Sequence, residues 1–576
     1  MPKKWLIAEP ITSEIQKQFP EFDRVVLQLL WNRGQQSQEQ MDVFLGPDWS
    51  RDTYDPALFL NMHTAVQRVF RALNEGEVIT IHGDYDADGT CGTAVLFITL
   101  RDVCRSFGFD ESKITTYIPH REKEGYGLSI PTIEQLSSHD KTTVVITVDC
   151  GISNKSAIDR GKELGIDTIV CDHHAMPVEL PDATLIHPQV PGETFPNKYL
   201  CGTGVAFKLA SALISEARAQ GAELPEGFEK WLLDLVAIAT VTDVVPLTGE
   251  NRVLETYGLR VLNKTRRIGI RKLLDVAGST LGELDTVSIG FQIGPRLNAA
   301  GRMTHAQEAL ALLIEEDEVE ASKLAMRLQE INVERQKASQ EMYLEAKAQL
   351  GDVTGLSLLV AVQEGWGAGL VGLVAGKLLG DFGIPVFVVG KEGDRYVGSG
   401  RSIEGFDITQ ALHHAKDYLD KFGGHPQACG FSSHGNERFE HAVEMMKRYA
   451  AEHIDAQTLE PTIQADAQIS LEDISWELFD AVQKFRPFGS GNATPLFVSR
   501  QVHVSSFATV GKEGAHLKLG LESQTGKRVE AIGFRFGEWT QKLTLGCAID
   551  IVFEIQVNEW NGNRSLQIRI VDLQLL

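Results

Sequence analysis

The chain has 576 residues, which is too long for one ordinary hydrophobic core and predicts three or four domains. Its composition, 43% hydrophobic and 23% charged, excludes a disordered or fibrous protein. A formal net charge of -23 argues against a protein that coats nucleic acid non-specifically, since such binding depends on Lys and Arg. It leaves room for a nuclease with a local basic channel.

The start of the chain, MPKKWLIAEP, has an apolar run too short for a signal peptide. No later segment reaches the roughly 18 apolar residues of a membrane-spanning helix. The seven cysteines form no C-x-x-C pair, which is typical of a reducing compartment, so we expect a cytoplasmic protein. Cys150 and Cys171 lie beside acidic residues or His, and we interpret them as small buried hydrophobes rather than zinc ligands.

Short β-branched runs alternate with helical stretches from Glu77 to about Val245, which predicts strand-helix-strand units and a parallel sheet. The expected strands and the residues that follow them are 78–81 with His82, 143–148 with Asp149, and 168–170 with Cys171 and Asp172. Ligands of open parallel sheets bind beyond the carboxyl ends of the strands. We therefore expect these motif residues to meet in one place.

A stretch rich in Ala, Leu, Glu, Gln, Lys and Arg predicts one long connecting helix. Strand-like runs around a helical run then predict a second, smaller α/β domain, and short alternating strands from Thr462 onward predict a small barrel or sandwich. The expected division is an N-terminal segment 1–55, a catalytic domain 56–315, a helix 316–350, a second α/β domain 351–455 and an all-β domain 456–576.

The segment IHGDYDADGTCGTAVL places Asp84, Asp86 and Asp88 at alternate positions of a strand-to-helix loop. Their carboxylates repel one another, so a positive group is expected among them. An EF-hand loop would need Glu where Val95 stands, and a P-loop would need G-K-S/T before the helix. A solvated acidic turn would account for this segment alone, but not for acidic clusters at other strand ends.

Those further clusters are Asp149, the run Asp172-His173-His174, and Asp243. Carboxylate and imidazole ligands without a thiolate suit Mn²⁺ or Mg²⁺ better than structural zinc. One carboxylate that bridges two ions about 3.5–4 Å apart is the arrangement used for phosphoester hydrolysis. The sequence thus predicts a divalent-metal phosphodiesterase.

D-x-D-G after a strand, a later strand-terminal Asp, Asp-His-His and a further Asp resemble the DHH phosphoesterase superfamily. The resemblance implies two ions of Mn²⁺ or Mg²⁺, with Asp149 as the bridging ligand. The first ion would be held by His82, Asp86 and Asp149, and the second by Asp88, Asp149, His173 and Asp243. His174 would face the scissile phosphate, while Asp84 and Asp172 would orient their neighbours. Some members of the exonuclease branch lack a histidine at the position of His82, so this ligand has the least support.

KFGGHPQACGFS resembles the Gly-Gly-His motif of the companion DHHA1 domain, which implies substrate contacts by Gly423, Gly424 and His425. IPHREKEGYGLS, GPRLNAAGRM, GSGRS and RPFGSGNATPLF resemble the single-strand exonuclease branch of the superfamily. By this resemblance a 5′-terminal phosphate would be held by Arg121, Arg296, Ser399 and Arg401, since guanidinium groups bind phosphate in bidentate fashion. One departure is EGWGAGLVG, where Gly367 replaces the His common in that branch and puts the usual contact in doubt.

The implied fold class is α/β: a parallel-sheet DHH domain joined by a long helix to a smaller α/β DHHA1 domain, followed by a C-terminal all-β OB-fold. OB-folds bind single strands by a basic groove with aromatic stacking. The candidate residues are Lys512, Lys518, Trp560 and Arg564. Each of them is equally well explained as an ordinary surface residue of a barrel.

The resemblance implies a single-stranded-DNA-specific 5′→3′ exonuclease that releases 5′-mononucleotides in recombination and repair. It further implies a monomer, with a single-stranded-DNA-binding protein and a helicase as candidate partners. One alternative is an oligoribonuclease or cyclic-dinucleotide phosphodiesterase of the same superfamily, against which the four-part architecture speaks. The other is a binding module without activity, against which the complete set of metal ligands speaks.

Overall fold

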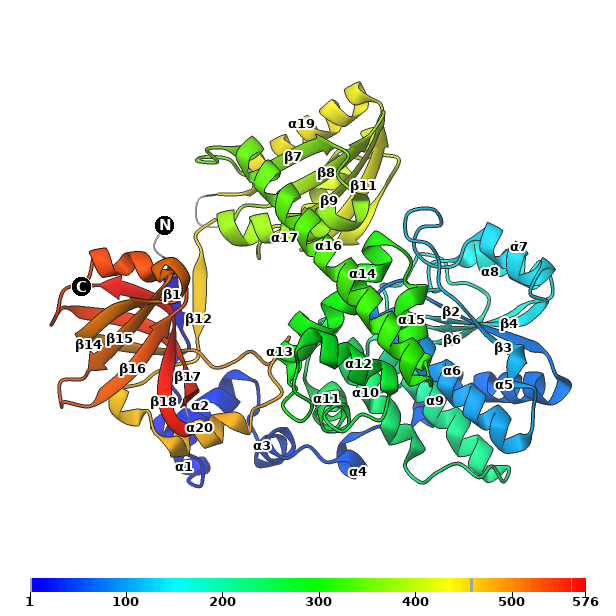
Figure 1. The fold of residues 1–576 in the computed structure, drawn as a ribbon, viewed down its shortest axis with the longest axis horizontal. Coiled ribbons are helices and arrows are strands. Elements are labelled where there is room, and N and C mark those ends of the chain that lie inside the picture. Colours follow the sequence, from blue (N-terminus) through cyan, green and yellow to red (C-terminus); the bar gives the residue numbers. More distant parts are fainter. Residues whose placement is uncertain (1–2, 456–458, 561) are drawn as a thin grey trace. The chain divides into compact units, whose positions relative to one another are not determined.

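The computed structural model describes residues 3–455, 459–560 and 562–576, without the side chain of Trp560, so that predicted nucleic-acid contact lies outside the described residues. The chain forms two compact units (Figure 1): Thr53–Leu459, and Met1–Asp52 together with Glu460–Leu576. Within the described residues, no helix has the length and apolar character needed to cross a membrane.

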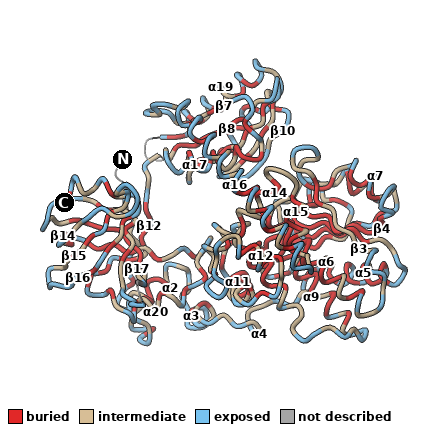
Figure 2. Tube along the Cα trace, in the orientation of Figure 1, coloured by how far each residue is buried: buried red, intermediate tan, exposed pale blue. Residues whose placement is uncertain are grey.

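The first α/β domain of the larger unit contains a five-stranded sheet in which all neighbouring strands are parallel. In sheet order the strands are β3 (Ile114–Tyr117), β2 (Val78–Gly83), β4 (Thr142–Val148), β5 (Asp167–Cys171) and β6 (Thr184–Ile186). The central β2 and β4 are buried almost throughout (Figure 2), which explains their unbroken β-branched runs. The predicted parallel sheet is confirmed.

Helices cover both faces of this sheet, as βαβ connections require (Figure 1). On one face lie α5 (Met62–Glu75), α6 (Ala87–Phe107) and α9 (Gly202–Ala219), and on the other α7 (Ile130–Ser138) and α8 (Lys155–Glu163). The helices that follow are α10 (Leu233–Thr242), α11 (Gly249–Leu262), α12 (Ile268–Ala277), α13 (Thr286–Ser288), the π-helix η4 (Ile289–Ile293), α14 (Gly294–Met303) and α15 (Gln307–Ile314).

The predicted connecting helix is confirmed as α16 (Glu318–Leu350), a single helix of 33 residues. Asp317 caps it by accepting the backbone N–H groups of Val319 and Glu320. It leads into a second sheet in the order β10-β11-β9-β8-β7, packed against α17 (Ala368–Phe382), α18 (Ile408–His414) and α19 (Asn436–His453). The strands are β7 (Leu359–Glu364), β8 (Val386–Glu392), β9 (Arg395–Arg401), β10 (Lys421–His425) and β11 (Ala428–His434).

The smaller unit contains a closed barrel, because β14 pairs with both β15 and β17 and the remaining pairs complete the circle. Its strands are β14 (Phe497–Val510), β15 (His516–Glu522), β16 (Arg528–Gly533), β17 (Ala548–Trp560) and β18 (Asn563–Leu575), with the short β13 (Ala467–Gln468) beside β14. Of the two architectures left open by the sequence, barrel and sandwich, the barrel is the one observed.

The first residues of the chain belong to the same unit as this barrel. β1 (Lys4–Ile7) pairs in parallel with β12 (Thr462–Ala465), and the indole of Trp5 donates a hydrogen bond of 2.8 Å to Asp572. Apolar side chains of α2 (Arg24–Asn32) and α3 (Gln38–Leu45) share one core with the barrel strands. The N-terminal segment is therefore a structural part of the C-terminal unit.

Candidate metal centre

Four chain segments bring carboxylates to the carboxyl edge of the parallel sheet. Asp86 caps α6 after strand β2 and accepts the backbone N–H groups of Asp88 and Gly89. Asp149 follows β4 directly, Asp172 follows β5, and Asp243 is the C-cap residue of α10. The convergence expected from the strand ends is thus observed.

Potential ligand atoms form three groups within 4.8 Å of one another: Asp84, Asp86 and Asp149; Asp88, His173 and Asp243; and Asp149, His173 and His174. His173 links the groups, since its Nε2 lies 3.1 Å from Asp149, 3.6 Å from Asp243 and 3.8 Å from Asp88. Asp149 belongs to two groups, as a bridging ligand would. The structure therefore brings together all the predicted metal ligands except His82.

His82 belongs to none of these groups among the described residues, although it is fully buried. Its ring stacks on Tyr117, and its Nδ1 lies 3.7 Å from the Sγ of Cys150. Burial lowers the pKa of His82 to about 4, so the ring is neutral, and its Nε2 has no hydrogen-bond partner. A neutral imidazole with an unused nitrogen fits a ligand role, which for His82 stays a prediction.

The backbone around Asp149 is constrained. Asp149 has a φ of 60°, a left-handed conformation that is uncommon outside glycine and that strains the chain. Gly202 packs so closely that an added Cβ would lie 2.5 Å from the Cβ of Asp149. The strand end and the start of α9 are therefore in direct contact at the centre of the site.

The start of α9 also holds Asp88, a contact that sequence reasoning missed. The backbone N–H groups of Gly202 and Thr203 each donate a 2.7 Å hydrogen bond to the Asp88 carboxylate. The positive end of the helix dipole favours the charged carboxylate there. The Gly-rich run CGTG before an apolar helix was the available signal.

His174 is held from two sides. Its Nδ1 lies 2.8 Å from Asp172 and 3.0 Å from the hydroxyl of Tyr126, which in turn donates to the backbone carbonyl of Asp149. Burial alone would raise the pKa of Asp172, but hydrogen bonds from His174 and from the backbone N–H of Ile152 outweigh it and lower the pKa to about 2. Burial likewise opposes protonation of His174, yet Asp172 raises its pKa. The pair therefore favours a charged imidazolium beside the metal ligands.

The remaining carboxylates show how crowded the negative charge is. Burial, followed by repulsion from Asp88 and Asp86, raises the pKa of Asp149 well above its usual range. Burial and the neighbouring Asp88 raise the pKa of Asp243 to about 9. Carboxylates so placed need either protons or cations between them. Oxygen and imidazole donors, with every cysteine thiol outside the three groups, fit Mn²⁺ or Mg²⁺.

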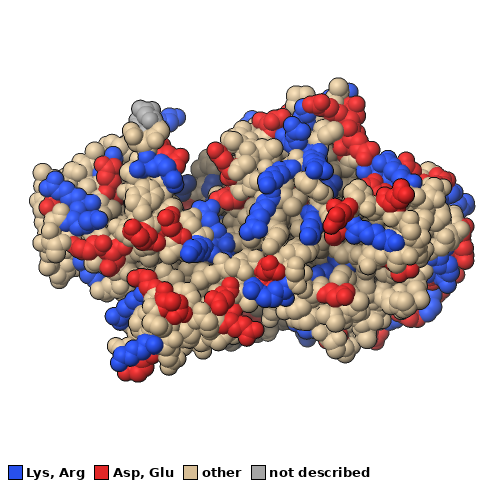
Figure 3. Space-filling view, turned by 90° about the horizontal axis from the view of Figure 1, so that it is seen from below, with Lys and Arg blue, Asp and Glu red and all other residues tan. Residues whose placement is uncertain are grey.

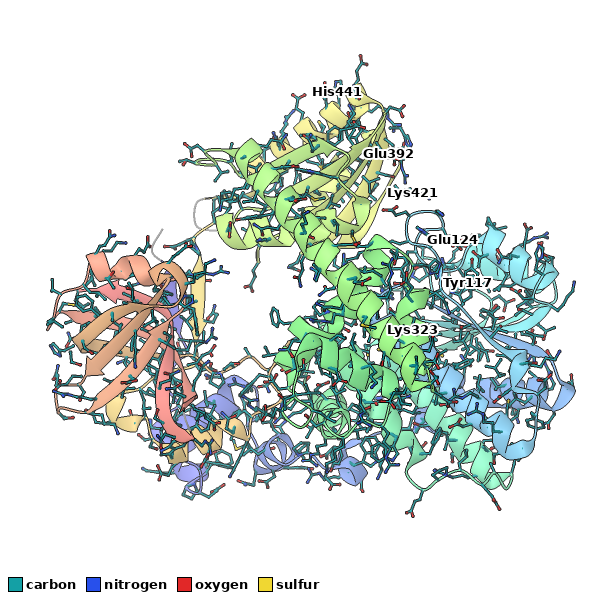
Figure 4. The ribbon with its side chains drawn as sticks, in the orientation of Figure 1. Tyr117, Glu124, Lys323, Glu392, Lys421 and His441 are labelled. Carbon is teal, nitrogen blue, oxygen red and sulfur yellow. The ribbon has the colours of Figure 1, made fainter. Side chains whose placement is uncertain are left out.

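The loop that carries the predicted phosphate contact Arg121 follows β3. It is fastened by Glu124, whose carboxylate accepts hydrogen bonds from the Tyr117 hydroxyl at 2.7 Å and from the backbone N–H of His120 at 2.8 Å (Figure 4). The guanidinium of Arg121 lies over the ring of Tyr85, 4.6 Å from its centroid. Tyr85 itself stands between Asp84 and Asp86 in the chain, so Arg121 lies beside the carboxylate edge.

Five arginines of the larger unit lie close enough to repel one another, and in the described residues none of these five forms an ion pair. They are Arg121, Arg296, Arg302, Arg335 and Arg401. Arg296 donates to the side chain of Gln329 and the carbonyl of Gln292, Arg302 to the carbonyl of Gly369, and Arg335 to the side chain of Asn332. All of these partners are neutral, so the full positive charge remains available. We call this set the arginine track.

The arginines of the track also repel one another. Burial, and then Arg121, lowers the pKa of Arg302 to about 10. Burial lowers the pKa of Arg335 and Arg401, to which Arg296 and Arg121 respectively contribute. Sequence reasoning had named Arg121, Arg296 and Arg401 but missed Arg302 and Arg335, although Arg302 lies in the motif GPRLNAAGRM. The same motif braces the acidic loop, since Asn298 accepts the backbone N–H of Ala87 at 2.7 Å.

The other predicted substrate contacts lie on the second sheet. Ser399 and Arg401 are on β9, where Arg401 donates to the Ser399 hydroxyl at 3.0 Å. Gly423, Gly424 and His425 lie on the edge strand β10, and all three are exposed. At Gly367 an added side chain would meet no atom within 4 Å, so the departure from the usual His leaves open space before α17. The role of each residue stays a prediction.

Known proteins match the chain in the order of its domains. Family models match the DHH family N-terminal domain at residues 78–240, the DHHA1 domain at 355–452 and the RecJ OB domain at 465–572. The single-stranded-DNA-specific exonuclease RecJ of Bacillus subtilis is 35% identical, over 98% of this chain and 71% of that protein.

Solved structures agree. RecJ of Thermus thermophilus in complex with Mn²⁺ matches with a TM-score of 0.83 and 27% identity, over 99% of this chain and 79% of that one. The complex of the same protein with Mg²⁺ matches with a TM-score of 0.76 and 25% identity, over 99% of this chain and 78% of that one. The fold and the carboxylate edge define a metal-dependent hydrolase of the DHH class, with DHHA1 and OB domains attached. The near full-length matches go further: the chain belongs to the RecJ family.

Proposed function

We propose that the chain is a single-stranded-DNA-specific exonuclease that hydrolyses phosphodiester bonds from a 5′ end and releases 5′-mononucleotides. The observation that carries the proposal is the arginine track, which lies beside a metal-binding carboxylate edge in a protein with a net charge of -23. Acidic and basic side chains are otherwise interspersed on the face seen in Figure 3. Unpaired arginines in an acidic protein are suited to a polyanionic substrate.

The metal ligands follow from the groups described above. Asp86 and Asp149, with His82, would hold one ion, and Asp88, Asp149, His173 and Asp243 the other. Bound divalent ions supply a nucleophilic water at neutral pH and neutralise charge that develops on the phosphate. The backbone N–H groups of Gly202 and Thr203 donate to the Asp88 carboxylate and orient it for this role.

The remaining residues position the substrate. The imidazole of His174, fixed by Asp172 and Tyr126, would face the scissile phosphate. Asp84, buried in the first acidic group, would orient its neighbours. Arg121, Arg296, Ser399 and Arg401 would hold the 5′-terminal phosphate, and Gly423, Gly424 and His425 would line the substrate on β10. Holding the end of the strand fixes which bond is cut.

The relatives and the barrel favour this function over an oligoribonuclease or a cyclic-dinucleotide phosphodiesterase, since small substrates have no use for an OB domain. We further propose a cytoplasmic monomer that acts in recombination and repair. The cysteines of the described chain form no disulfide, which supports a reducing compartment. A single-stranded-DNA-binding protein and a helicase are the proposed partners.

The experiment that tests the proposal is a digest of single-stranded DNA labelled at either end, in Mn²⁺ or Mg²⁺. We expect label at the 5′ end to be released at once as a mononucleotide, and label at the 3′ end to persist in shortening strands. Asp149→Ala should reduce the rate about a thousandfold or more, because two of the three ligand groups lose a ligand. Asp140→Ala, at an exposed carboxylate, is the matched control. Release of the 3′ label first, or full activity of Asp149→Ala, would contradict the proposal.

A further inference from the structure

Three large apolar side chains are exposed next to the metal centre. Val244 is 67% exposed, Val287 59% and Phe291 77%, and we call them together the apolar shelf. Single exposed apolar residues are common on protein surfaces. That general rule concerns isolated residues. It does not explain why one aromatic and two β-branched side chains are exposed beside the candidate metal centre.

The backbone of the shelf is irregular in two places. Val244 has a φ of 60°, and for a β-branched residue this left-handed conformation is a true outlier that strains the backbone. Phe291 lies in the middle of the π-helix η4, a rare form that is frequently found at functional sites. Both irregularities present an apolar side chain to solvent, which folding alone would disfavour.

The shelf adjoins the site on both sides. η4 packs on α10, and at Gly294, which follows η4 and begins α14, an added Cβ would lie 2.4 Å from the Cγ2 of Thr242, the residue before Asp243. On the other side, the carbonyl of Gln292, next to Phe291 in the chain, accepts a hydrogen bond from Arg296. The shelf therefore lies between a predicted metal ligand and a member of the arginine track.

The long helix α16 continues the same pattern. Met326 and Val333 are 52% and 51% exposed and, at a spacing of seven residues, lie on one face of the helix. Gln329, between them on this face, accepts the hydrogen bond from the Nε of Arg296. Exposed apolar side chains of α16 therefore lie near Arg296, as the exposed Phe291 of η4 does.

We propose that the apolar shelf is a stacking surface for the bases of the single strand next to the 5′-terminal phosphate that Arg296 would hold, and that Arg335 binds the following phosphate. The inference rests on the proposed function. A single strand alternates flat apolar bases with charged phosphates, and proteins that hold it without sequence preference pair aromatic faces with cations. Phe291 supplies the aromatic face. A carbohydrate or a peptide without phosphates would leave the two arginines without a partner.

The test compares binding of a 5′-phosphorylated oligothymidine with binding of an abasic strand of the same length, by fluorescence anisotropy in EDTA, so that no hydrolysis occurs. Phe291→Ala should bind the oligothymidine about tenfold more weakly, within the range of one base–aromatic contact, and the abasic strand as the wild type does. Phe291→Tyr, which keeps the ring, should retain the wild-type affinity for both strands.

Two further variants separate the possible outcomes. Leu60→Ala removes a side chain of comparable exposure, 60%, elsewhere in the same unit and should leave both affinities unchanged. Arg296→Gln should weaken binding of both strands equally, because it acts on phosphates. No loss in Phe291→Ala, or an equal loss on both strands, would overturn the stacking role. A wild-type protein that binds neither strand would overturn the proposed function, and the shelf with it.

Discussion

The arginine track and the basic residues of the barrel strands carry the same charge in opposite settings. Every Lys and Arg on the described barrel strands contacts a carboxylate: Arg500 with Asp550, Lys518 with Glu530, Arg528 with Glu522, Arg564 with Glu559 and Arg569 with Glu554. The arginines of the track have only neutral partners. The barrel cations are already paired with carboxylates of their own domain, whereas the cations of the track have no carboxylate partner in the described residues.

The difference teaches that sequence position alone does not identify a phosphate contact. Lys518 and Arg564 were candidates for nucleic-acid binding because an OB-fold carries them. Lys518 lies 3.0 Å from Glu530 and Arg564 lies 2.7 Å from Glu559, so a strand would have to compete with these carboxylates. Lys512, between β14 and β15, forms no ion pair in the described residues, so its charge is available to a strand.

Arg401 offers the most direct test of the difference between unpaired and paired cations. Arg401→Gln should lower the preference for a 5′-phosphate over a 5′-hydroxyl end about ten- to hundredfold, the value of one or two hydrogen bonds to a charged group. The measurement is kcat/KM on the two strands with either end. Arg564→Gln, which removes a paired cation, serves as the control. If both variants lost the preference to the same extent, the distinction between paired and unpaired cations would fail.

The carboxylate edge adds a third case to the comparison of paired and unpaired cations. Its negative charge is balanced by protons or metal rather than by arginines. The pKa of Asp243 is raised to about 9, so the metal-free fold prefers the protonated acid, and the stability this contributes at low pH is lost as the pH rises through that value. Metal must displace the proton. We expect Mn²⁺ affinity to rise about tenfold per pH unit for each proton released below pH 9.

Calorimetric titration with Mn²⁺ in two buffers of different ionisation enthalpy measures that proton release. Asp243→Asn should bind more weakly and release fewer protons, while Glu283→Gln, at an exposed carboxyl, should match the wild type. An affinity that does not change with pH would show that the carboxylates are already charged in the metal-free protein.

The smallest expected effect concerns salt. Each phosphate that a single strand places on a cation contributes about 0.7 to the slope of log K against log salt concentration. Arg335→Gln should reduce the slope by about this amount, and Lys518→Gln should leave it unchanged. Binding titrations at several salt concentrations measure this slope for each variant. A reduction by Lys518→Gln equal to that of Arg335→Gln would mean that the ion pair with Glu530 opens for DNA.

Much of the catalytic fold was predictable because buried parallel strands have a plain signal. The runs before His82, Asp149 and Asp172 are short, β-branched and each followed directly by a motif, so the ends of the strands and their meeting point could be inferred. The long helix was predictable for a similar reason, since 33 residues pass without Gly or Pro. Patterns of this kind can be interpreted from neighbouring residues in the sequence alone, without information on contacts to distant parts of the chain.

What the sequence could not supply were contacts that depend on distant parts of the chain. Gly202 and Thr203 bind Asp88 from more than a hundred residues away, through backbone groups that carry no side-chain signature. Arg302 and Arg335 look like ordinary helix residues until the lack of an acidic partner is seen. The shelf residue Phe291 would be assigned to the core by any periodic pattern, because π-helical geometry leaves no mark in hydrophobicity.

The pairing of β1 with β12 has a consequence for how the molecule is made. The strand Lys4–Ile7 is synthesised before its partner Thr462–Ala465, and the whole of Thr53–Leu459 lies between them in the chain. At about 5–20 residues per second, that interval is roughly 20 to 90 seconds. The catalytic unit can fold within it as an insertion, while the first helices wait with their apolar faces uncovered. Premature termination after residue 459 would therefore release a complete metal centre that carries an unfolded, aggregation-prone leader.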